Sequence, residues 1–85
     1  MKKTFYPKGV CASRFDIELE DGIIKDMRAV GGCNGNLSGI SALLRGRSAE
    51  EVIGLLRGVK CGFKNTSCPD QLSYALEEAL KEEQA

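Results

Sequence analysis

The sequence predicts an α+β domain in which a small antiparallel sheet of two or three strands is covered by about three helices. The first observation is an alternation of apolar and charged residues over residues 14–30, interrupted by Asp21-Gly22, which is typical of a half-buried β-hairpin. The second is a series of three stretches after residue 36 with apolar residues at helical spacing. Because the strands come first and the helices follow, the order favours α+β over an alternating α/β fold.

The paired strands are expected at residues 14–20 and 23–30, and residues 4–7 are expected to add an edge strand. Gly22 supplies the positive φ that a tight turn requires. Two registers remain open at this stage. A three-residue loop places Phe15 opposite Met27, whereas a two-residue loop places Glu18 opposite Lys25.

The three helices are expected to begin and end at recognisable signals. The first begins after an N-cap at Asn36 and ends near Gly46. The second begins with Ser48-Ala49-Glu50-Glu51, a capping box in which Ser and Glu satisfy free N–H groups reciprocally, and it closes at Gly58. The third has the clearest apolar stripe, formed by Leu72, Ala75, Leu76, Ala79 and Leu80.

Composition limits the function. The 85 residues form a single expected domain, 1–85, in a size range where a hydrophobic core alone gives marginal stability. A metal, disulfides or homo-oligomer formation would supplement it. The net charge is zero without a polybasic strip, so nucleic acid binding is not expected. No signal-peptide or membrane-spanning stretch is present, so we expect a cytoplasmic protein.

Four cysteines and no histidine make sulfur chemistry the main functional indication. The spacing, C-x21-C-x27-C-x6-C, contains no C-x2-C pair and matches no zinc-ribbon or ferredoxin signature. The placement says more, since all four lie in expected loops or at element ends: Cys11, Cys33, Cys61 and Cys68. We expect their sulfurs to meet at one end of the fold and to hold a metal or cluster. Thiol redox chemistry, disulfides and incidental thiols are the alternatives.

The helix starts favour thiolate chemistry. Cys33 and Cys68 each precede an expected helix, where free N–H groups and the helix dipole stabilise a thiolate. Pro69 suits the first helical position. Four thiolates suit tetrahedral Zn²⁺ or an iron–sulfur cluster, and helix N-termini with Lys60 and Lys64 would compensate the charge.

The remaining polar residues give no sign of catalysis. Asp70 and Gln71 are expected to cap the last helix. Without histidine or a paired-carboxylate site, no intrinsic enzyme activity is expected.

Three segments carry a resemblance to a known family. They are Gly31-Gly32-Cys33-Asn34-Gly35-Asn36-Leu37, Gly58-Val59-Lys60-Cys61-Gly62 and Thr66-Ser67-Cys68-Pro69-Asp70-Gln71-Leu72. Together they resemble the TSCPD-domain family of small four-cysteine proteins, also found as a C-terminal module of cobalamin-dependent ribonucleotide reductases. The resemblance covers roughly residues 7–81. It implies a metal-binding module associated with ribonucleotide reduction, and any reductase activity would belong to the fused family members.

The order of elements is also similar to iron–sulfur scaffold proteins of the IscU/NifU type. That resemblance implies an IscU-like fold, and it carries the scaffold cysteines onto Cys11, Cys33 and Cys68. The scaffold family has histidine where this chain has Ser67 and aspartate where it has Ser13, while Cys61 has no counterpart there. These departures favour a four-thiolate site over cluster assembly.

The sequence thus predicts a small metal-binding module that holds Zn²⁺ or an iron–sulfur cluster through four cysteines. The alternatives are an accessory thiol-redox module for a ribonucleotide reductase and a scaffold or carrier for iron–sulfur clusters. The expected partner is accordingly a ribonucleotide reductase or a protein that assembles or receives clusters. No membrane partner is expected.

Overall fold

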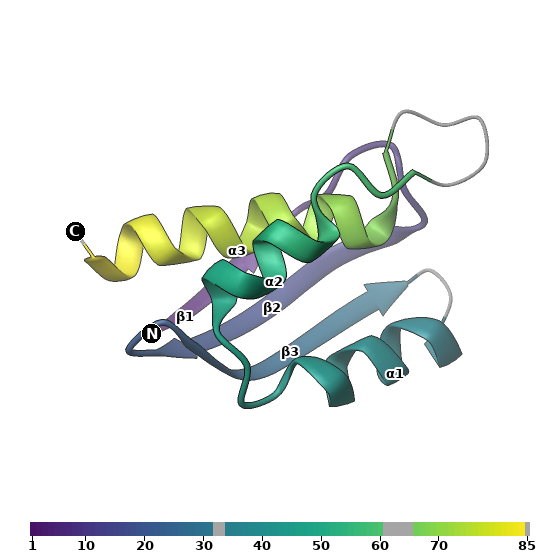
Figure 1. Ribbon diagram of the computed structural model, residues 1–85. Helices are drawn as coiled ribbons and strands as arrows, with labels where there is room; N and C mark the ends of the chain where they lie inside the picture. The colour runs from purple at the N-terminus through teal and green to yellow at the C-terminus, as the bar shows by residue number, and fades with distance from the viewer. Residues whose placement is uncertain (32–33, 61–65, 85) are drawn as a thin grey trace.

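The strands precede the helices, as the α+β prediction required. The structure is a computed structural model that describes residues 1–31, 34–60 and 66–84, with side chains described for all of these except 34–37. The described elements, in order, are β1 (Lys2–Phe5), β2 (Ala12–Glu20), β3 (Ile23–Gly31), α1 (Asn34–Leu44), α2 (Ala49–Leu56) and α3 (Cys68–Gln84) (Figure 1). No described helix has the length and apolar character needed to cross a membrane.

The sheet is antiparallel in the order β1-β2-β3, and its apolar face is covered by the helices. One continuous core joins the inward residues of β2 and β3 to residues of all three helices. Its largest fully buried side chains are Phe15, Ile17, Leu19, Ile24, Met27, Val52, Leu72 and Leu76. The other face is polar, and a solvent-open depression of about 350 Å³ there has charged residues of all three strands in its lining. One apolar face therefore organises the whole fold.

The hairpin has the two-residue loop but neither of the predicted registers. Asp21 and Gly22 both have positive φ, 52° and 79°, as a two-residue hairpin turn with the right twist requires. Glu20 pairs with Ile23, yet Glu18 pairs with Asp26 and not with Lys25. The reason is a β-bulge, in which Lys25 is the extra residue on β3.

The bulge reconciles two buried residues that simple alternation would place on opposite faces. Ile24 and Met27 are three residues apart, and both are at most 1% exposed. With one extra residue between them, both side chains point to the same face of the sheet. A second irregularity, at Ser13 on β2, does the same for Ala12 and Phe15. Because of the two-residue loop and the bulge at Lys25, Phe15 pairs with Ala29. The predicted Phe15–Met27 pairing was therefore wrong.

The edge strand starts two residues before its predicted start, and the first helix starts three residues before its predicted start. β1 occupies Lys2–Phe5 and pairs along β2, whereas the sequence placed it at residues 4–7. α1 begins at Asn34, so Asn36 lies inside the helix and is not its N-cap. The segment Asn34-Gly35-Asn36 contains more than one residue suited to a helix start, so the local sequence did not select between them.

The second helix follows its predicted signals. Ser48 is the N-cap of α2, and its hydroxyl accepts a hydrogen bond from the backbone N–H of Glu51 at 3.4 Å. The helix ends at Leu56, and Gly58 follows with a φ of +85°. The capping-box prediction is therefore confirmed for its serine half.

Arg57 joins the end of α2 to α3. Its Nε donates to Ser73 Oγ at 2.7 Å, and its Nη2 lies 2.5 Å from Glu77 Oε2. The guanidinium also lies 3.9 Å from the centre of the Tyr74 ring. The hydrogen bond from Arg57, and to a lesser degree that from Lys81, lowers the pKa of Glu77. These contacts of Arg57 hold the turn after α2 against α3.

We predict a pH-dependent contribution of the Arg57–Glu77 pair to stability. A carboxylate whose pKa is lowered by folding stabilises the fold above its unfolded pKa and loses that contribution as the pH falls through the folded value. Glu77→Gln should therefore lower the melting temperature at neutral pH, and its difference from wild type should shrink below about 4.5, the ordinary glutamate pKa. Thermal melts across this range test it, with Glu78→Gln on the exposed face of α3 as control. A difference that does not vary with pH would contradict the prediction.

Candidate metal centre

Cys68 is the first residue of α3, as its position in the sequence indicated. The backbone N–H of Gln71 donates to the Ser67 carbonyl at 2.9 Å, and that of Asp70 donates to Ser67 Oγ at 3.2 Å. Ser67 is therefore the N-cap, and the helix starts one residue before Pro69. Cys68 is half-buried and packs against the core, so its thiol lies in the capped first turn of α3.

Cys11 lies just before β2 and is exposed. The adjoining Ala12 pairs with Gly31, the last residue of β3. Gly31 has a φ of +80°, and a Cβ added to it would lie 3.5 Å from the Cys11 carbonyl oxygen. The strand that leads toward Cys33 thus ends directly beside Cys11.

The segment before Cys11 lies against the N-terminus of α3. The backbone N–H of Lys8 donates to Gln71 Oε1 at 3.2 Å. A Cβ added to Gly9 would lie 3.5 Å from Thr66 Cγ2. Chain segments about 60 residues apart in sequence are therefore in contact where α3 begins.

Asp70 links the turn after α2 to the residues before α3. Its side chain is 5% exposed. Oδ1 accepts from the Gly58 backbone N–H at 2.7 Å, and Oδ2 accepts from Thr66 Oγ1 at 2.5 Å. Asp70 was predicted to cap α3, but the structure assigns that role to Ser67. Its acidic side chain reaches across to Gly58, 12 residues earlier.

Ser67 makes a second link between the same two segments. Its hydroxyl donates to the Val59 carbonyl at 2.6 Å while it accepts from Asp70 N. The resemblance to the scaffold proteins identifies Ser67 only as the residue in place of their histidine. Its capping position, directly before the Cys-Pro pair, was the signal that could have identified this role.

The electrostatics favour an ionised Asp70. The hydrogen bond from Thr66 has the largest effect in lowering the pKa of this carboxyl, and that from the Gly58 N–H comes next. Desolvation opposes them, while the positive charges of Arg57 and Lys60 add to the lowering. The carboxylate therefore acts as a hydrogen-bond acceptor only.

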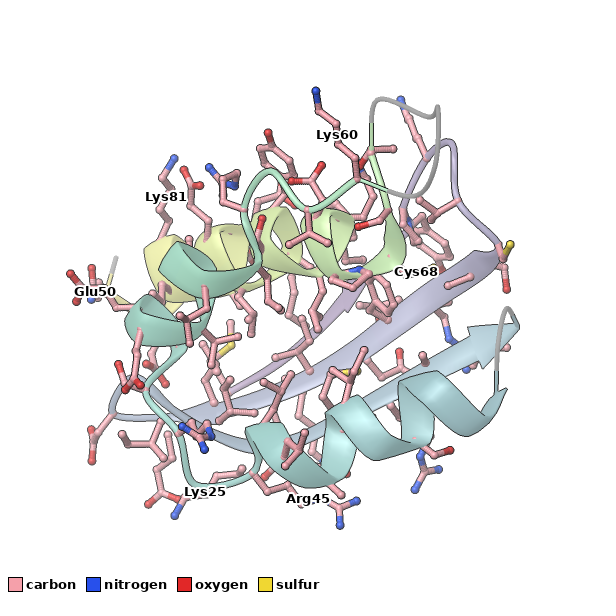
Figure 2. The ribbon with its side chains drawn as sticks, turned by 45° about the vertical axis from the view of Figure 1, so that its right-hand side comes forward. Lys25, Arg45, Glu50, Lys60, Cys68 and Lys81 are labelled. Carbon is pink, nitrogen blue, oxygen red and sulfur yellow. The ribbon has the colours of Figure 1, made fainter. Side chains whose placement is uncertain are left out.

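The described segments that lie next to the four cysteines in the sequence gather at one end of the fold. In Figure 1 the β1–β2 connection, the end of β3 and the starts of α1 and α3 lie at the end opposite the two termini, and Figure 2 shows Cys68 and Lys60 toward that same end. Cys11 and Cys68 are free thiols. Cys33 and Cys61, the other two predicted ligands, and Lys64 lie outside the described residues. Within residues 1–31, 34–60 and 66–84, no three metal-binding side chains form a cluster.

We predict that Asp70→Ala destabilises the metal-free protein by roughly 1.5–3 kcal/mol, the range for hydrogen bonds to a charged group. The substitution leaves the Gly58 N–H and the Thr66 hydroxyl without their acceptor. Asp70→Asn keeps an oxygen for Gly58 and should lose less. Urea denaturation under reducing conditions measures both. A loss below about 0.5 kcal/mol, the range of ordinary surface substitutions, would show that these bonds add little.

The comparisons with known proteins agree with the motif-based resemblance. Comparison with curated proteins and with solved structures finds no match, so the IscU-like likeness stays a prediction. A family model described as the TSCPD domain matches residues 1–80. Because this match spans most of the 85 residues, the chain belongs to the TSCPD-domain family.

Proposed function

We propose that this protein is a small metal-binding module that holds Zn²⁺ or an iron–sulfur cluster through four thiolates. The ligands are Cys11, Cys33, Cys61 and Cys68, and the module has no catalytic activity of its own. The observation that carries the proposal is the convergence of the described segments next to these cysteines. We further propose that the protein acts in the cytoplasm, where reduced thiols are available to a metal.

Chain connectivity supports a common site. Cys33 follows Gly31 by two residues, and Cys61 follows Val59 by two residues. Two residues of extended chain reach about 7 Å. Gly31 lies against the Cys11 backbone, and Val59 is hydrogen-bonded to Ser67, the neighbour of Cys68. The described residues that precede Cys33 and Cys61, Gly31 and Val59, thus lie beside the segments of Cys11 and Cys68.

The donor set suits a soft cation. Thiolates prefer Zn²⁺ and iron–sulfur clusters to Mg²⁺ or Ca²⁺, and the described thiols are not consumed by a disulfide. A bound Zn²⁺ would supply a closed tetrahedral link between the loops, with no open position for a reacting water. The N-terminus of α3 beside Cys68 and the exposed Lys60 would offset the charge of the thiolates.

One observation favours a second candidate, an iron–sulfur carrier. Cys11 is exposed, and a ligand accessible to solvent is more easily exchanged than a buried one. The partner would then be a protein that assembles or receives clusters. If the metal is instead retained, the partner is a ribonucleotide reductase, and the module serves it as an accessory domain. We favour the retained metal because four thiolates hold Zn²⁺ tightly.

We predict different effects for the two described cysteines. Cys11→Ser should leave the melting temperature of the metal-free protein unchanged, because Cys11 is exposed, but should lower that of the metal-loaded protein. Cys68→Ser should lower both, because Cys68 packs against the core. Binding of a structural metal is coupled to folding, so a chelator should lower the melting temperature of wild type to the metal-free value.

The measurements are elemental analysis after purification without oxygen, followed by melts with and without Zn²⁺. Alkylation and mass measurement under non-reducing conditions separate a metal site from two disulfides. Identical melting of metal-loaded and metal-free wild type would contradict the proposal.

We predict that a reconstituted cluster stays with the protein. The test is reconstitution with iron and sulfide without oxygen, followed by mixing with an apo-ferredoxin. Transfer should be no faster than spontaneous cluster assembly on the ferredoxin in the same buffer. Rapid transfer of an intact cluster would establish the carrier function instead.

A further inference from the structure

A continuous hydrogen-bond chain crosses the end of the fold where β1 connects to β2 and α3 begins, which we call the thiol end. Lys8 N–H donates to Gln71 Oε1 at 3.2 Å, and Gln71 Nε2 donates to Thr66 Oγ1 at 3.1 Å. Thr66 Oγ1 then donates to Asp70 Oδ2 at 2.5 Å, and Asp70 Oδ1 accepts from Gly58 N. The chain begins three residues before Cys11 and ends three residues before Cys61. It includes residues on both sides of Cys68 in the sequence, Thr66 before it and Asp70 and Gln71 after it.

The direction of every bond follows from the backbone N–H groups of Lys8 and Gly58 at its two ends, which can only donate. The Thr66 hydroxyl donates its single proton to Asp70 Oδ2. The hydroxyl oxygen is then free to accept from Gln71, whose amide must turn its nitrogen toward Thr66. This leaves Gln71 Oε1 as the acceptor for the Lys8 N–H. A reversed amide would place two acceptors together at Thr66 and two donors together at Lys8.

We propose that Thr66 and Gln71 are positioning residues of the thiol site, which hold the segment of Cys11 on the helix N-terminus that carries Cys68. Neither residue supplies a ligand. This inference rests on the proposed metal-binding function. It adds that the spacing of the thiols depends on the neutral side chains of Thr66 and Gln71. Thr66 is hydrogen-bonded to Asp70, and Gln71 connects Thr66 to Lys8 in the β1–β2 connection.

Partial burial makes these bonds consequential. Thr66 and Gln71 are both half-buried, and a polar group removed from water without a partner carries a free-energy penalty. A Cβ added to Gly9 would lie in ordinary van der Waals contact with the Thr66 methyl group, at 3.5 Å, so the β1–β2 connection lies beside Thr66. The hydrogen bonds oppose its movement away from α3.

The test uses isosteric substitutions that remove the bonds and keep the shape. Thr66→Val removes both the donor and the acceptor, and Gln71→Met keeps the chain length but loses both amide bonds. Thr66→Ser keeps the hydroxyl and is the conservative control. Glu77→Gln, which breaks an ion pair elsewhere on α3, is the control for a general loss of stability. Gln71→Met also serves as the second variant if Thr66→Val does not fold.

Two readouts are measured on the full chain with all four cysteines. The first is affinity for Zn²⁺, by competition with a chromogenic chelator. The second is the effective concentration of the thiols, from the equilibrium of intramolecular disulfide formation in glutathione buffers. This second quantity reports how closely the thiols are held without any metal. Thr66→Val and Gln71→Met should each lower the Zn²⁺ affinity about tenfold, the lower end of the range for residues that orient ligands, and should lower the effective concentration as well.

The outcomes separate the two proposals. Unchanged values in Thr66→Val and Gln71→Met, or losses that Glu77→Gln and Thr66→Ser reproduce, overturn the positioning role. If wild type binds no Zn²⁺ and reconstitution yields no cluster, the proposed function fails. A lower effective concentration in Thr66→Val or Gln71→Met would still support positioning in that case, and an unchanged one would overturn it.

Discussion

The buried carboxylate of Asp70 is the constraint on which the thiol end of this fold depends. A charged group removed from water requires hydrogen-bond donors, and Asp70 finds them in the Gly58 N–H and the Thr66 hydroxyl. These donors lie on either side of the connection between α2 and α3. The requirement to satisfy one charge therefore holds both ends of that connection together at the start of α3. The cap formed by Ser67 acts on the same two segments through Val59, so the arrangement has two independent links.

The rest of the fold provides a platform that brings the remaining segments to the same place. A single apolar face of the sheet is covered by the helices, and burial of this face supplies the main stabilisation. The irregularity at Ser13 allows Ala12 and Phe15 to be buried on the same face, and Cys11, the neighbour of Ala12, is exposed. Ser13 Oγ also donates to the Val30 carbonyl at 3.0 Å, which joins β2 to β3 near their shared end. The start of β2 and the end of β3 are thus linked beside the N-terminus of α3.

The two described thiols differ in their surroundings, and this difference shapes any chemistry at the site. Cys68 belongs to a capped helix that packs against the core, whereas Cys11 is exposed at the start of a strand. A thiol in the first turn of a packed helix and an exposed thiol on a connection are unequal ligands. A metal held between them would link segments that the small core stabilises only weakly, since a chain of this size buries limited apolar surface. Retention or exchange of the proposed metal would thus depend on how firmly the Cys11 segment is held.

The sequence by itself determined the fold class and the order of the elements. Alternation around Phe15, the turn at Asp21-Gly22 and the cap at Ser48 are local signals, because neighbouring residues supply the partners. Pro69 and the apolar stripe of the last helix, which are also local signals, placed Cys68 at a helix start. The register, the N-cap of α3 and the role of Asp70 were decided only by tertiary structure. The bulge at Lys25 exists because two residues at odd spacing are both buried against the helices, and Asp70 turns from a capping position to Gly58 because that donor becomes available only when α2 packs on α3. Local patterns report hydrogen bonds and periodicity within a segment, whereas burial and distant donors are set when the segments meet.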